Sequence, residues 1–330
     1  MNTNALRQKI LDLAIHGKLV KQDPADEPAS VMLEKIRAEK EAKIAAGEIK
    51  RSKNDSYIFK YTGTSSENKT DDNPEGLEHN RHYEKFADGR VKDIEDEIPF
   101  AVPEGWAWCR LPNILISIFA GGDRPIISEK TQSDKCNIPI YSNGIENNGL
   151  YGFTNKPVVN VSSITISARG TIGFSCIRYE PFVPIVRLIT IIPFTKYIDL
   201  VFLKIAFDTL FSFSEGSSIP QLTVPTIKQF LIPLPPIAEQ KRIVTAIETI
   251  FTQIDLLEQN KADLQTAVKQ AKSKILDLAI HGKLVPQDPA DEPASVMLEK
   301  LRAEKEAKIA AGEIKRGKND SYIYRNPTDN

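Results

Sequence analysis

The sequence predicts an α+β fold, in which one curved domain of mixed strands and helices is joined to long helical segments. Three observations lead to this prediction. A segment near the N-terminus, 9–60, recurs almost unchanged as 274–325. Between the two copies, short β-type runs are interrupted by Gly, Asn and Pro, and an apolar heptad pattern follows them. The predicted order is an N-terminal helical segment, a flexible linker, a central domain, a long helix and a second copy of the N-terminal segment, over residues 1–60, 61–97, 98–236, 237–285 and 286–330.

The composition indicates a soluble protein with a hydrophobic core. Hydrophobic residues make up 41% and charged residues 26% of the 330 residues, and the formal net charge is −1. Three separated cysteines without a CxxC pair suggest a reducing compartment and no zinc site. The first residues show no signal-peptide pattern, and no run of about 18 apolar residues occurs. We therefore expect a cytoplasmic protein that makes no use of a membrane.

Each copy of the repeat predicts the same pair of helices. In the first copy, apolar residues at helical spacing over 6–14 end at Gly17, which suits a helix C-terminus. A second helix is expected to begin near Pro28 and to end at Gly47. The two copies differ at only five of 52 positions. The repeat then either docks at two equivalent places in a pseudo-symmetric assembly, or opens a further module, or is a duplication without structural purpose.

The segment 62–96 predicts a mobile linker, because it is rich in Asn, Asp, Glu, Gly, Ser and Lys and poor in aliphatic residues. It contains His79 and His82, whose spacing could suit two metal ligands. No Glu or Cys stands at a fitting distance, so the linker interpretation is favoured over a metal site.

The central domain predicts a mixed fold of short strands with one helix, which is expected over 200–213. The runs with β-type composition are 111–119, 138–141, 157–161, 164–167, 172–177 and 182–192.

After the prolines at 233–236, the pattern changes to a heptad repeat. Apolar residues spaced by four and three, with one lysine among them, define what we call the apolar stripe: Ile243, Ile247, Ile250, Ile254, Leu257, Lys261, Leu264, Val268, Ala271, Ile275 and Leu278. One helix from Glu239 to Gly282 would be about 66 Å long at about 1.5 Å per residue. The stripe could fold back on its own domain, but a coiled coil with another long helix is favoured.

No catalytic motif occurs in the sequence. A phosphate-binding Gly-x4-Gly-Lys-Ser/Thr loop, a Gly-x-Gly-x-x-Gly turn and a Gly-x-Ser-x-Gly elbow are all missing. Asp123, Glu129 and Lys130 have the wrong spacing for a nuclease set, and four histidines outside the central domain leave little for acid–base chemistry. We therefore expect no enzymatic activity, no metal and no cofactor on this chain.

The central domain does carry polar side chains that suit base edges and phosphates. Arg can bind guanine, Asn and Gln can bind adenine, and Ser, Thr and Lys suit phosphates. Residues 99–236 hold 11 Lys and Arg against nine Asp and Glu, so this part is positive. The candidate DNA-binding residues are Arg124, Lys130, Lys135, Asn143, Asn147, Asn148, Arg169, Thr171, Ser217, Ser218 and Gln221.

Four stretches resemble the specificity subunits of Type I restriction–modification systems: KILDLAIHGKLV at 9–20, IPFAVPEGWAW at 98–108, SARGTIG at 167–173 and IPLPPIAEQKRIV at 232–244. The last is the most specific. The resemblance implies a globular target-recognition domain with long helices that pair antiparallel. It also implies double-stranded DNA as ligand, with no catalysis by this subunit. Modification subunits, which bind S-adenosylmethionine, would methylate the DNA, and a restriction subunit would cleave it.

The resemblance also shows a departure. A full specificity subunit is expected to contain two recognition domains, whereas this sequence contains one, so it is similar to a half-subunit. A homodimer through antiparallel long helices, with Lys261 near the twofold axis, would then read a split palindrome. The alternative is a coiled-coil scaffold that does not read bases.

Overall fold

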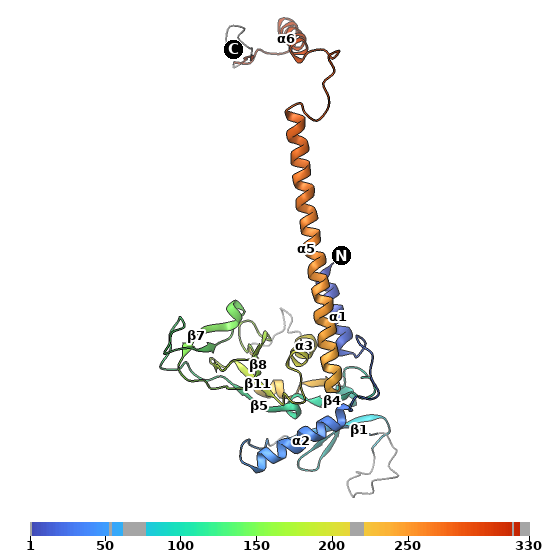
Figure 1. Cartoon of the computed structure of the whole chain (residues 1–330), viewed down its shortest axis with the longest axis vertical. Coiled ribbons are helices and arrows are strands. Elements are labelled where there is room, and N and C mark those ends of the chain that lie inside the picture. Colours follow the sequence, from blue (N-terminus) through green and yellow to red (C-terminus); the bar gives the residue numbers. More distant parts are fainter. Residues whose placement is uncertain (1, 53–54, 62–76, 212–220, 319, 324–330) are drawn as a thin grey trace. The chain divides into compact units, whose positions relative to one another are not determined.

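The computed structural model describes residues 2–52, 55–61, 77–211, 221–318 and 320–323. The chain divides into two compact units, Met1–Leu256 and Leu257–Asn330. The α-helices of the described part, labelled where there is room in Figure 1, are α1 (Thr3–Ile15), α2 (Ala29–Ala45), α3 (Leu200–Leu210), α4 (Val224–Lys228), α5 (Ile237–Ile280) and α6 (Ala294–Ala310). No helix within these described ranges is both long and apolar enough to cross a membrane.

The strands confirm the predicted α+β class. They are β1 (Ser56–Tyr61), β2 (Arg81–Phe86), β3 (Val91–Asp93), β4 (Ala107–Arg110), β5 (Leu115–Ala120), β6 (Ile138–Tyr141), β7 (Leu150–Thr154), β8 (Ser163–Ile166), β9 (Ser175–Arg178), β10 (Val183–Pro184), β11 (Ile189–Pro193) and β12 (Leu231–Leu234). They form one four-stranded sheet of order β5-β11-β8-β9, two three-stranded sheets, β1-β2-β3 and β10-β6-β7, and the pair β12-β4. Only β10 and β6 pair in parallel among these strands.

The two helices predicted for the first repeat copy are α1 and α2. The side chain of Asn2 caps α1 by accepting a hydrogen bond from the Ala5 amide at 3.2 Å. Gly17 follows α1 with a φ of +64°, and a Cβ at this position would lie 2.3 Å from Cγ of Pro103. Glycine therefore suits this position for two reasons: it adopts the left-handed backbone angle readily, and it leaves room for the close approach of Pro103, which a side chain would block.

The linker prediction is wrong for residues 81–93, which form β2 and β3. β2 lies in the middle of its sheet and pairs antiparallel with both β1 and β3. Tyr83 and Glu84 are buried there, and the His82 ring bonds to Glu95 at 2.7 Å between Nδ1 and Oε2. The polar composition did not predict these strands, because their stability comes from pairing with β1 and from one buried face. Residues 62–76 of the predicted linker lie outside the described residues.

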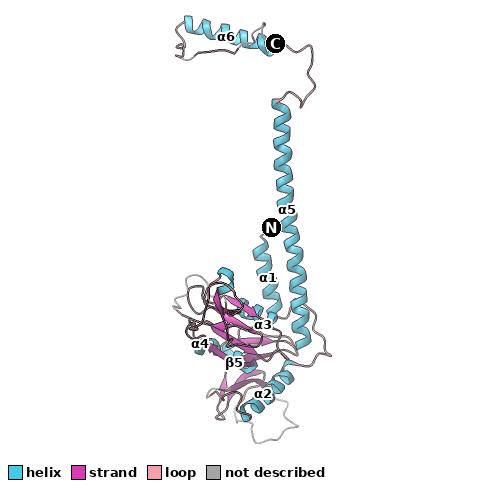
Figure 2. Ribbon diagram, turned by 60° about the vertical axis from the view of Figure 1, so that its left-hand side comes forward, coloured by secondary structure: helices cyan, strands magenta, loops and turns pink. Residues whose placement is uncertain are grey.

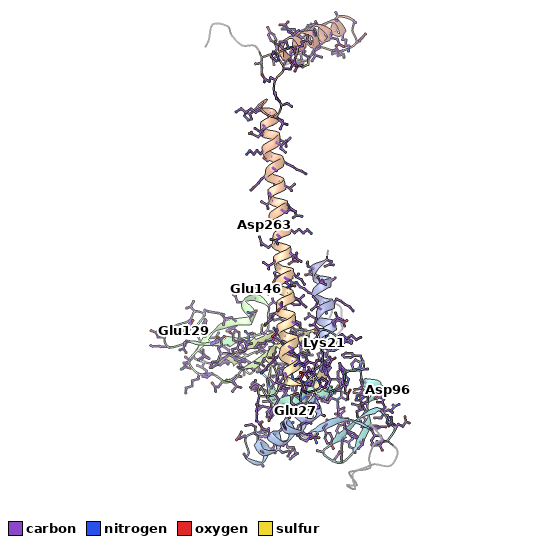
Figure 3. All side chains as sticks on the ribbon, turned by 45° about the vertical axis from the view of Figure 1, so that its right-hand side comes forward. Lys21, Glu27, Asp96, Glu129, Glu146 and Asp263 are labelled. Carbon is purple, nitrogen blue, oxygen red and sulfur yellow. The ribbon has the colours of Figure 1, made fainter. Side chains whose placement is uncertain are left out.

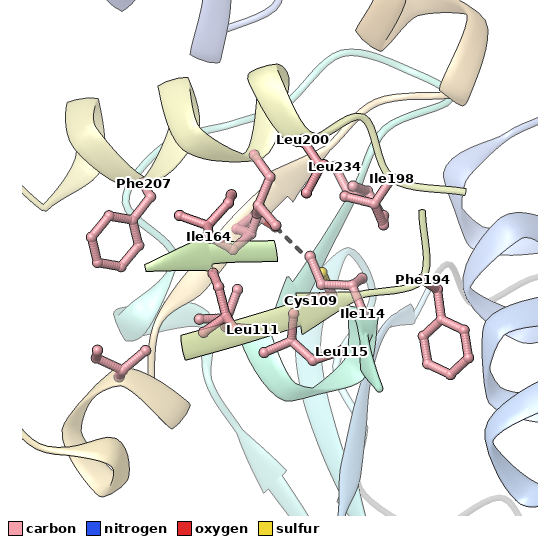
Figure 4. Close-up of a cluster of buried hydrophobic side chains, with 14 of the residues drawn as sticks. Cys109, Leu111, Ile114, Leu115, Ile164, Phe194, Ile198, Leu200, Phe207 and Leu234 are labelled. Carbon is pink, nitrogen blue, oxygen red and sulfur yellow. Dashed lines mark hydrogen bonds between the residues drawn. The ribbon is translucent and has the colours of Figure 1, made fainter. Parts of the chain in front are cut away.

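The main core lies between the four-stranded sheet, α3, the β12-β4 pair and α2. Figure 4 shows part of this cluster around Cys109, whose thiol donates a hydrogen bond of 3.8 Å to the Ile232 carbonyl. Burial raises the pKa of Cys109 to about 12. The thiol therefore stays protonated at neutral pH and packs as a small apolar group.

Within the central domain, four of the predicted strands differ from the structure, and the run 172–177 forms β9 only from Ser175 to Arg178. Pro112 opens a 3-10 helix over Leu111–Ile114, so β5 begins only at Leu115. Residues 157–161 contribute an isolated bridge between Val159 and Phe182 rather than a strand. The run 182–192 is divided into β10 and β11 by a turn. The helix predicted over 200–213 is confirmed as α3, one turn shorter within the described residues.

The predicted long helix is confirmed as α5, which has 44 residues. In the first unit, α1 lies alongside the beginning of α5, as Figure 2 shows, and the Arg7 guanidinium forms an ion pair of 2.5 Å with Asp255. The apolar residues that pack between these helices and α3 include Ile10, Ala14, Phe202, Ala206, Ile243, Ile247 and Ile254. The first part of the apolar stripe is therefore covered within its own unit.

The second unit contains the end of α5 and the helix α6. α6 has the same length as α2, 17 residues, and no residue of α6 is buried. Several large apolar side chains of this unit are exposed: Leu257, Leu264, Val268, Ile275, Leu276, Ile280, Met297 and Leu301.

Candidate nucleic-acid interface

Most of the predicted DNA-contacting residues lie in loops that follow strands of the central domain. The loops are 121–137 between β5 and β6, 142–149 between β6 and β7, 167–174 between β8 and β9, and 185–188 between β10 and β11. In Figure 3, the labels of Glu129 and Glu146 mark the first two of these loops.

Asn143 joins two of the loops through its side-chain amide. Its Oδ1 accepts a hydrogen bond of 2.7 Å from the backbone amide of Ala168, and its Nδ2 donates one of 2.7 Å to the carbonyl of Val186. A base contact of the kind predicted for Asn143 would need the same two atoms. In this structure, Asn143 positions the turn that carries Arg169 beside the turn that carries Arg187.

Arg169 is exposed at the tip of the β8–β9 turn. Its Nη2 donates a hydrogen bond of 2.9 Å to Oε1 of Gln221. Gln221 is held beside the same turn, because the amide of the next residue, Leu222, donates to the Ala168 carbonyl at 3.0 Å. The structure thus brings together two predicted residues, Arg169 and Gln221, that are 52 positions apart in the sequence.

Val186 and Arg187 form a turn that the sequence did not reveal. Both have positive φ angles, of 53° and 61°, and both side chains are exposed. Their amides donate to the carbonyls of Gly122 and Gly121 at 2.8 and 2.9 Å. A β-branched residue rarely takes this conformation, which costs about 1–3 kcal/mol. The surrounding hydrogen bonds hold the turn, and Arg187 joins the candidate site.

The residues Gly121, Gly122, Asn143, Ala168, Arg169, Val186, Arg187 and Gln221 are thus linked by direct hydrogen bonds, and we call this group the loop face.

A basic pair lies farther along the 121–137 loop. Arg124 donates a hydrogen bond of 3.3 Å to the Tyr151 hydroxyl, and the Lys130 ammonium lies 4.0 Å from the centre of the Tyr151 ring. The Arg124 hydrogen bond and the two positive charges lower the pKa of Tyr151. Arg124 and Lys130 are exposed, so this pair offers positive charge to a phosphate backbone.

The other predicted residues have differing surroundings. Lys135, Asn147 and Asn148 are exposed, and both asparagines have left-handed backbone angles within the β6–β7 loop. The Thr171 hydroxyl is buried and has no hydrogen-bond partner within the described part of the chain, so it does not point to solvent. Ser217 and Ser218 lie outside the described residues.

One arginine of the central domain has a structural position instead. Arg178 is 6% exposed, lies over the Tyr141 ring at 3.5 Å and donates from Nε to the Thr165 hydroxyl at 3.1 Å. Burial of the guanidinium lowers the pKa of Arg178. Burial of the Tyr141 hydroxyl and its hydrogen bond to Glu180 raise the pKa of Tyr141 to about 12. Arg178 braces β8 and β9 and is not available to a ligand.

Along α5, the structure divides the apolar stripe in two. Ile243, Ile247 and Ile254 are buried and Ile250 is half-buried, because α1 and α3 cover them. The favoured prediction, a coiled coil with another long helix, is therefore wrong for this part, where the alternative, packing against its own domain, is observed. The remaining stripe residues, of which only Leu278 is half-buried and the others are exposed, are Leu257, Lys261, Leu264, Val268, Ala271, Ile275 and Leu278.

Residues 103–266 match the family described as the Type I restriction modification DNA specificity domain. Over 364 residues the chain is 29% identical to the Type I restriction enzyme EcoAI specificity subunit of Escherichia coli, a match that covers 95% of this chain and 57% of the relative. It is 34% identical over 113 residues to the C-terminal part of a type I specificity subunit from Mycoplasma pneumoniae, covering 34% of this chain and 77% of that relative.

Among solved structures, the HsdS subunit of Thermoanaerobacter tengcongensis is similar at 23% identity and a TM-score of 0.42, over 56% of this chain and 47% of that one. The chain spans little more than half the length of the Escherichia coli relative, 57%. The family match lies over the central domain, and this chain covers most of the Mycoplasma relative. Both findings agree with the family resemblance that the sequence motifs indicate. The chain belongs to the family of Type I restriction–modification specificity subunits.

Proposed function

We propose that this chain is the DNA-specificity subunit of a Type I restriction–modification complex and reads one half of a bipartite site. The observation that carries this proposal is the loop face, where Asn143 ties the Arg169 turn to the Arg187 turn. Two exposed guanidinium groups with a glutamine amide suit base edges, and preorganised turns lower the cost of ordering them on DNA. The pair Arg124 and Lys130 suits the phosphate backbone.

The chain itself is proposed to catalyse no reaction. Its loop face offers hydrogen-bond donors and acceptors but, among the described residues, no group of three or more His, Cys, Asp or Glu that could hold a metal ion. Modification subunits with bound S-adenosylmethionine are the proposed site of methylation, and a restriction subunit is the proposed site of cleavage.

Two copies are further proposed to pair through α5. From Leu257 to Leu278 the apolar stripe lies almost entirely on the surface, with Leu264 66% exposed. Two identical helices that pair antiparallel obey a twofold axis, and one polar residue such as Lys261 can fix their register. A twofold dimer with one recognition unit per chain would read a split palindrome.

The variant Arg169→Ala is expected to weaken binding to the preferred DNA by about 1–3 kcal/mol, because a guanidinium contact to a base edge is lost. The loss should be concentrated at one position of the half-site. Fluorescence anisotropy with single-base substitutions in the duplex measures it. If thermal stability falls while base preference stays the same, Arg169 only braces its turn.

DNA affinity is expected to fall steeply with salt. Each neutralised phosphate contributes about −0.9 to the slope of log K against log salt concentration. The double variant Arg124→Ala/Lys130→Ala should therefore make the slope shallower by about 2 and leave base preference unchanged. An affinity that is independent of salt would contradict DNA contact and favour a scaffold that does not read bases.

A further inference from the structure

The second helix of the repeat has the same local structure in both copies. α2 and α6 have equal lengths, and each is preceded by a proline with a φ of −57°. In both copies an arginine of the helix lies 3.8 Å over a tyrosine ring that follows it, Arg37 over Tyr57 and Arg302 over Tyr322. The helix therefore keeps its conformation in both surroundings, whereas residues 56–58 lie in β1 and their counterparts 321–323 lie in no strand.

Burial, in contrast, differs sharply between the copies. Met32 is 1% exposed and its counterpart Met297 is 49% exposed. Ile15 is 3% exposed and its counterpart Ile280 is 83% exposed. The second copy therefore presents, in the docking conformation, the same apolar side chains that the first copy buries against the recognition unit.

Polar contacts fix the place of the first copy. Asp26 forms an ion pair of 2.5 Å with Arg242, and Gln22 donates a hydrogen bond of 3.0 Å to Glu239. The second copy has the same residue types at the positions of Asp26 and Gln22, namely Asp291 and Gln287.

Of the five differing positions, only one is buried in the first copy, and it exchanges Ile36 for Leu301. The two side chains have equal volume, a change that cores tolerate. The surface that receives the first copy therefore fits the second.

We propose that the second copy of one chain binds to the recognition unit, Met1–Leu256, of another molecule of this chain, at the place held there by the first copy. The exchange is reciprocal, so two chains close into a twofold dimer. This inference rests on the proposed pairing of two chains and specifies its contacts. It also makes the two copies competitors, because one place cannot hold both.

The exchange fixes a register for the paired α5 helices. α1 runs antiparallel to α5, since Arg7 meets Asp255 whereas Gln22 meets Glu239. With the second copy in place of the first, Lys272 takes the position of Arg7 and faces Asp255 of the other molecule. The twofold axis then passes beside Asp263 and Leu264, within one helical turn of Lys261.

Cross-linking between two differently tagged full-length chains tests the proposal. One chain carries Ala290→Cys, next to Asp291, and the other carries Lys241→Cys, next to Arg242. Both carry Cys176→Ser, because Cys176 is the half-exposed native thiol, and a short bis-maleimide is the reagent. We expect a cross-linked species that contains both tags. If no cross-linked species contains both tags, the exchange is overturned.

Two neighbouring substitutions on α6 sharpen the test. Met297→Asp should reduce the two-tag cross-link at least about tenfold, because its carboxylate would be buried where Met32 now packs. Val296→Asp is the matched control: Val296 is 36% exposed, and its counterpart Val31 is 37% exposed in the docked copy. Val296→Asp should leave the cross-link unchanged. Equal effects of both variants would contradict docking through the Met297 face.

Weakening the first copy should have the opposite effect. Met32→Asp is expected to raise the two-tag cross-link, and its thermal stability should increase with protein concentration because the second copy of another chain can replace the damaged one. The double variant Met32→Asp/Met297→Asp should lose that concentration dependence. A Met32→Asp chain whose stability is the same at all concentrations would count against the exchange.

These measurements need no DNA. If sedimentation still shows a dimer while the cross-link is missing, the exchange fails and the proposed pairing through α5 stands. If the salt-dependent DNA binding is missing instead, the proposed reading of DNA fails.

Discussion

The variant Ile247→Asp is expected to lose at least about 3 kcal/mol of unfolding free energy, because a carboxylate without a partner would be buried between α1, α3 and α5. Ile247 is 3% exposed in that cluster. Chemical denaturation of the full chain, monitored by circular dichroism and by tryptophan fluorescence, measures the loss.

Leu264→Asp provides the matched control on the same stripe. Leu264 is 66% exposed, so the substitution should change the unfolding free energy of the first unit by less than about 0.5 kcal/mol. Its effect should appear instead as weaker association in analytical ultracentrifugation. Comparable losses of stability for Ile247→Asp and Leu264→Asp would contradict the division of the stripe into a covered and an open part.

The variant Asn143→Ala is expected to have the largest effect on DNA recognition. It removes the two hydrogen bonds that hold the Arg169 and Arg187 turns together, so both arginines lose their fixed positions. We expect a loss of about 2–4 kcal/mol of specific binding free energy, with a smaller loss for nonspecific DNA. Competition titrations with specific and random duplexes measure the two losses separately.

Asn147→Ala is the control for this substitution. Asn147 lies in the same loop, is exposed, and takes no part in the bonds of the loop face. Its replacement should cost at most one base contact. If Asn143→Ala behaves like Asn147→Ala, the amide of Asn143 does not organise the interface.

The sequence predicted the elements that depend on local periodicity. The helices α1, α2 and α5 follow from apolar spacing and from glycine or proline near their ends, α3 was predicted over 200–213, and β6 was predicted with its observed bounds, 138–141. Strands that depend on distant partners were harder to predict. β2 has a polar sequence and is stabilised by its neighbours on both sides, so composition alone indicated a linker.

The candidate site shows the same limit. Arg169 and Arg178 look alike in the sequence, yet one is exposed in a turn and the other is buried on Tyr141, because burial is decided by tertiary packing. Val186 and Arg187 were predicted as part of a continuous strand, but they form a turn, in which their amides donate to the carbonyls of Gly122 and Gly121 and Asn143 donates to the Val186 carbonyl. The repeat also shows that tertiary packing decides burial, since apolar residues of nearly identical segments are buried in one unit and exposed in the other.

We proposed that this chain reads DNA as one half of a twofold pair. Selection of bound duplexes from a random pool, by the full chain together with its modification subunits, tests this proposal. We expect enrichment of a split palindrome, whose two short inverted half-sites are identical and are separated by base pairs without preference. A pool with no enriched sequence, or an enriched site with two unrelated halves, would contradict it.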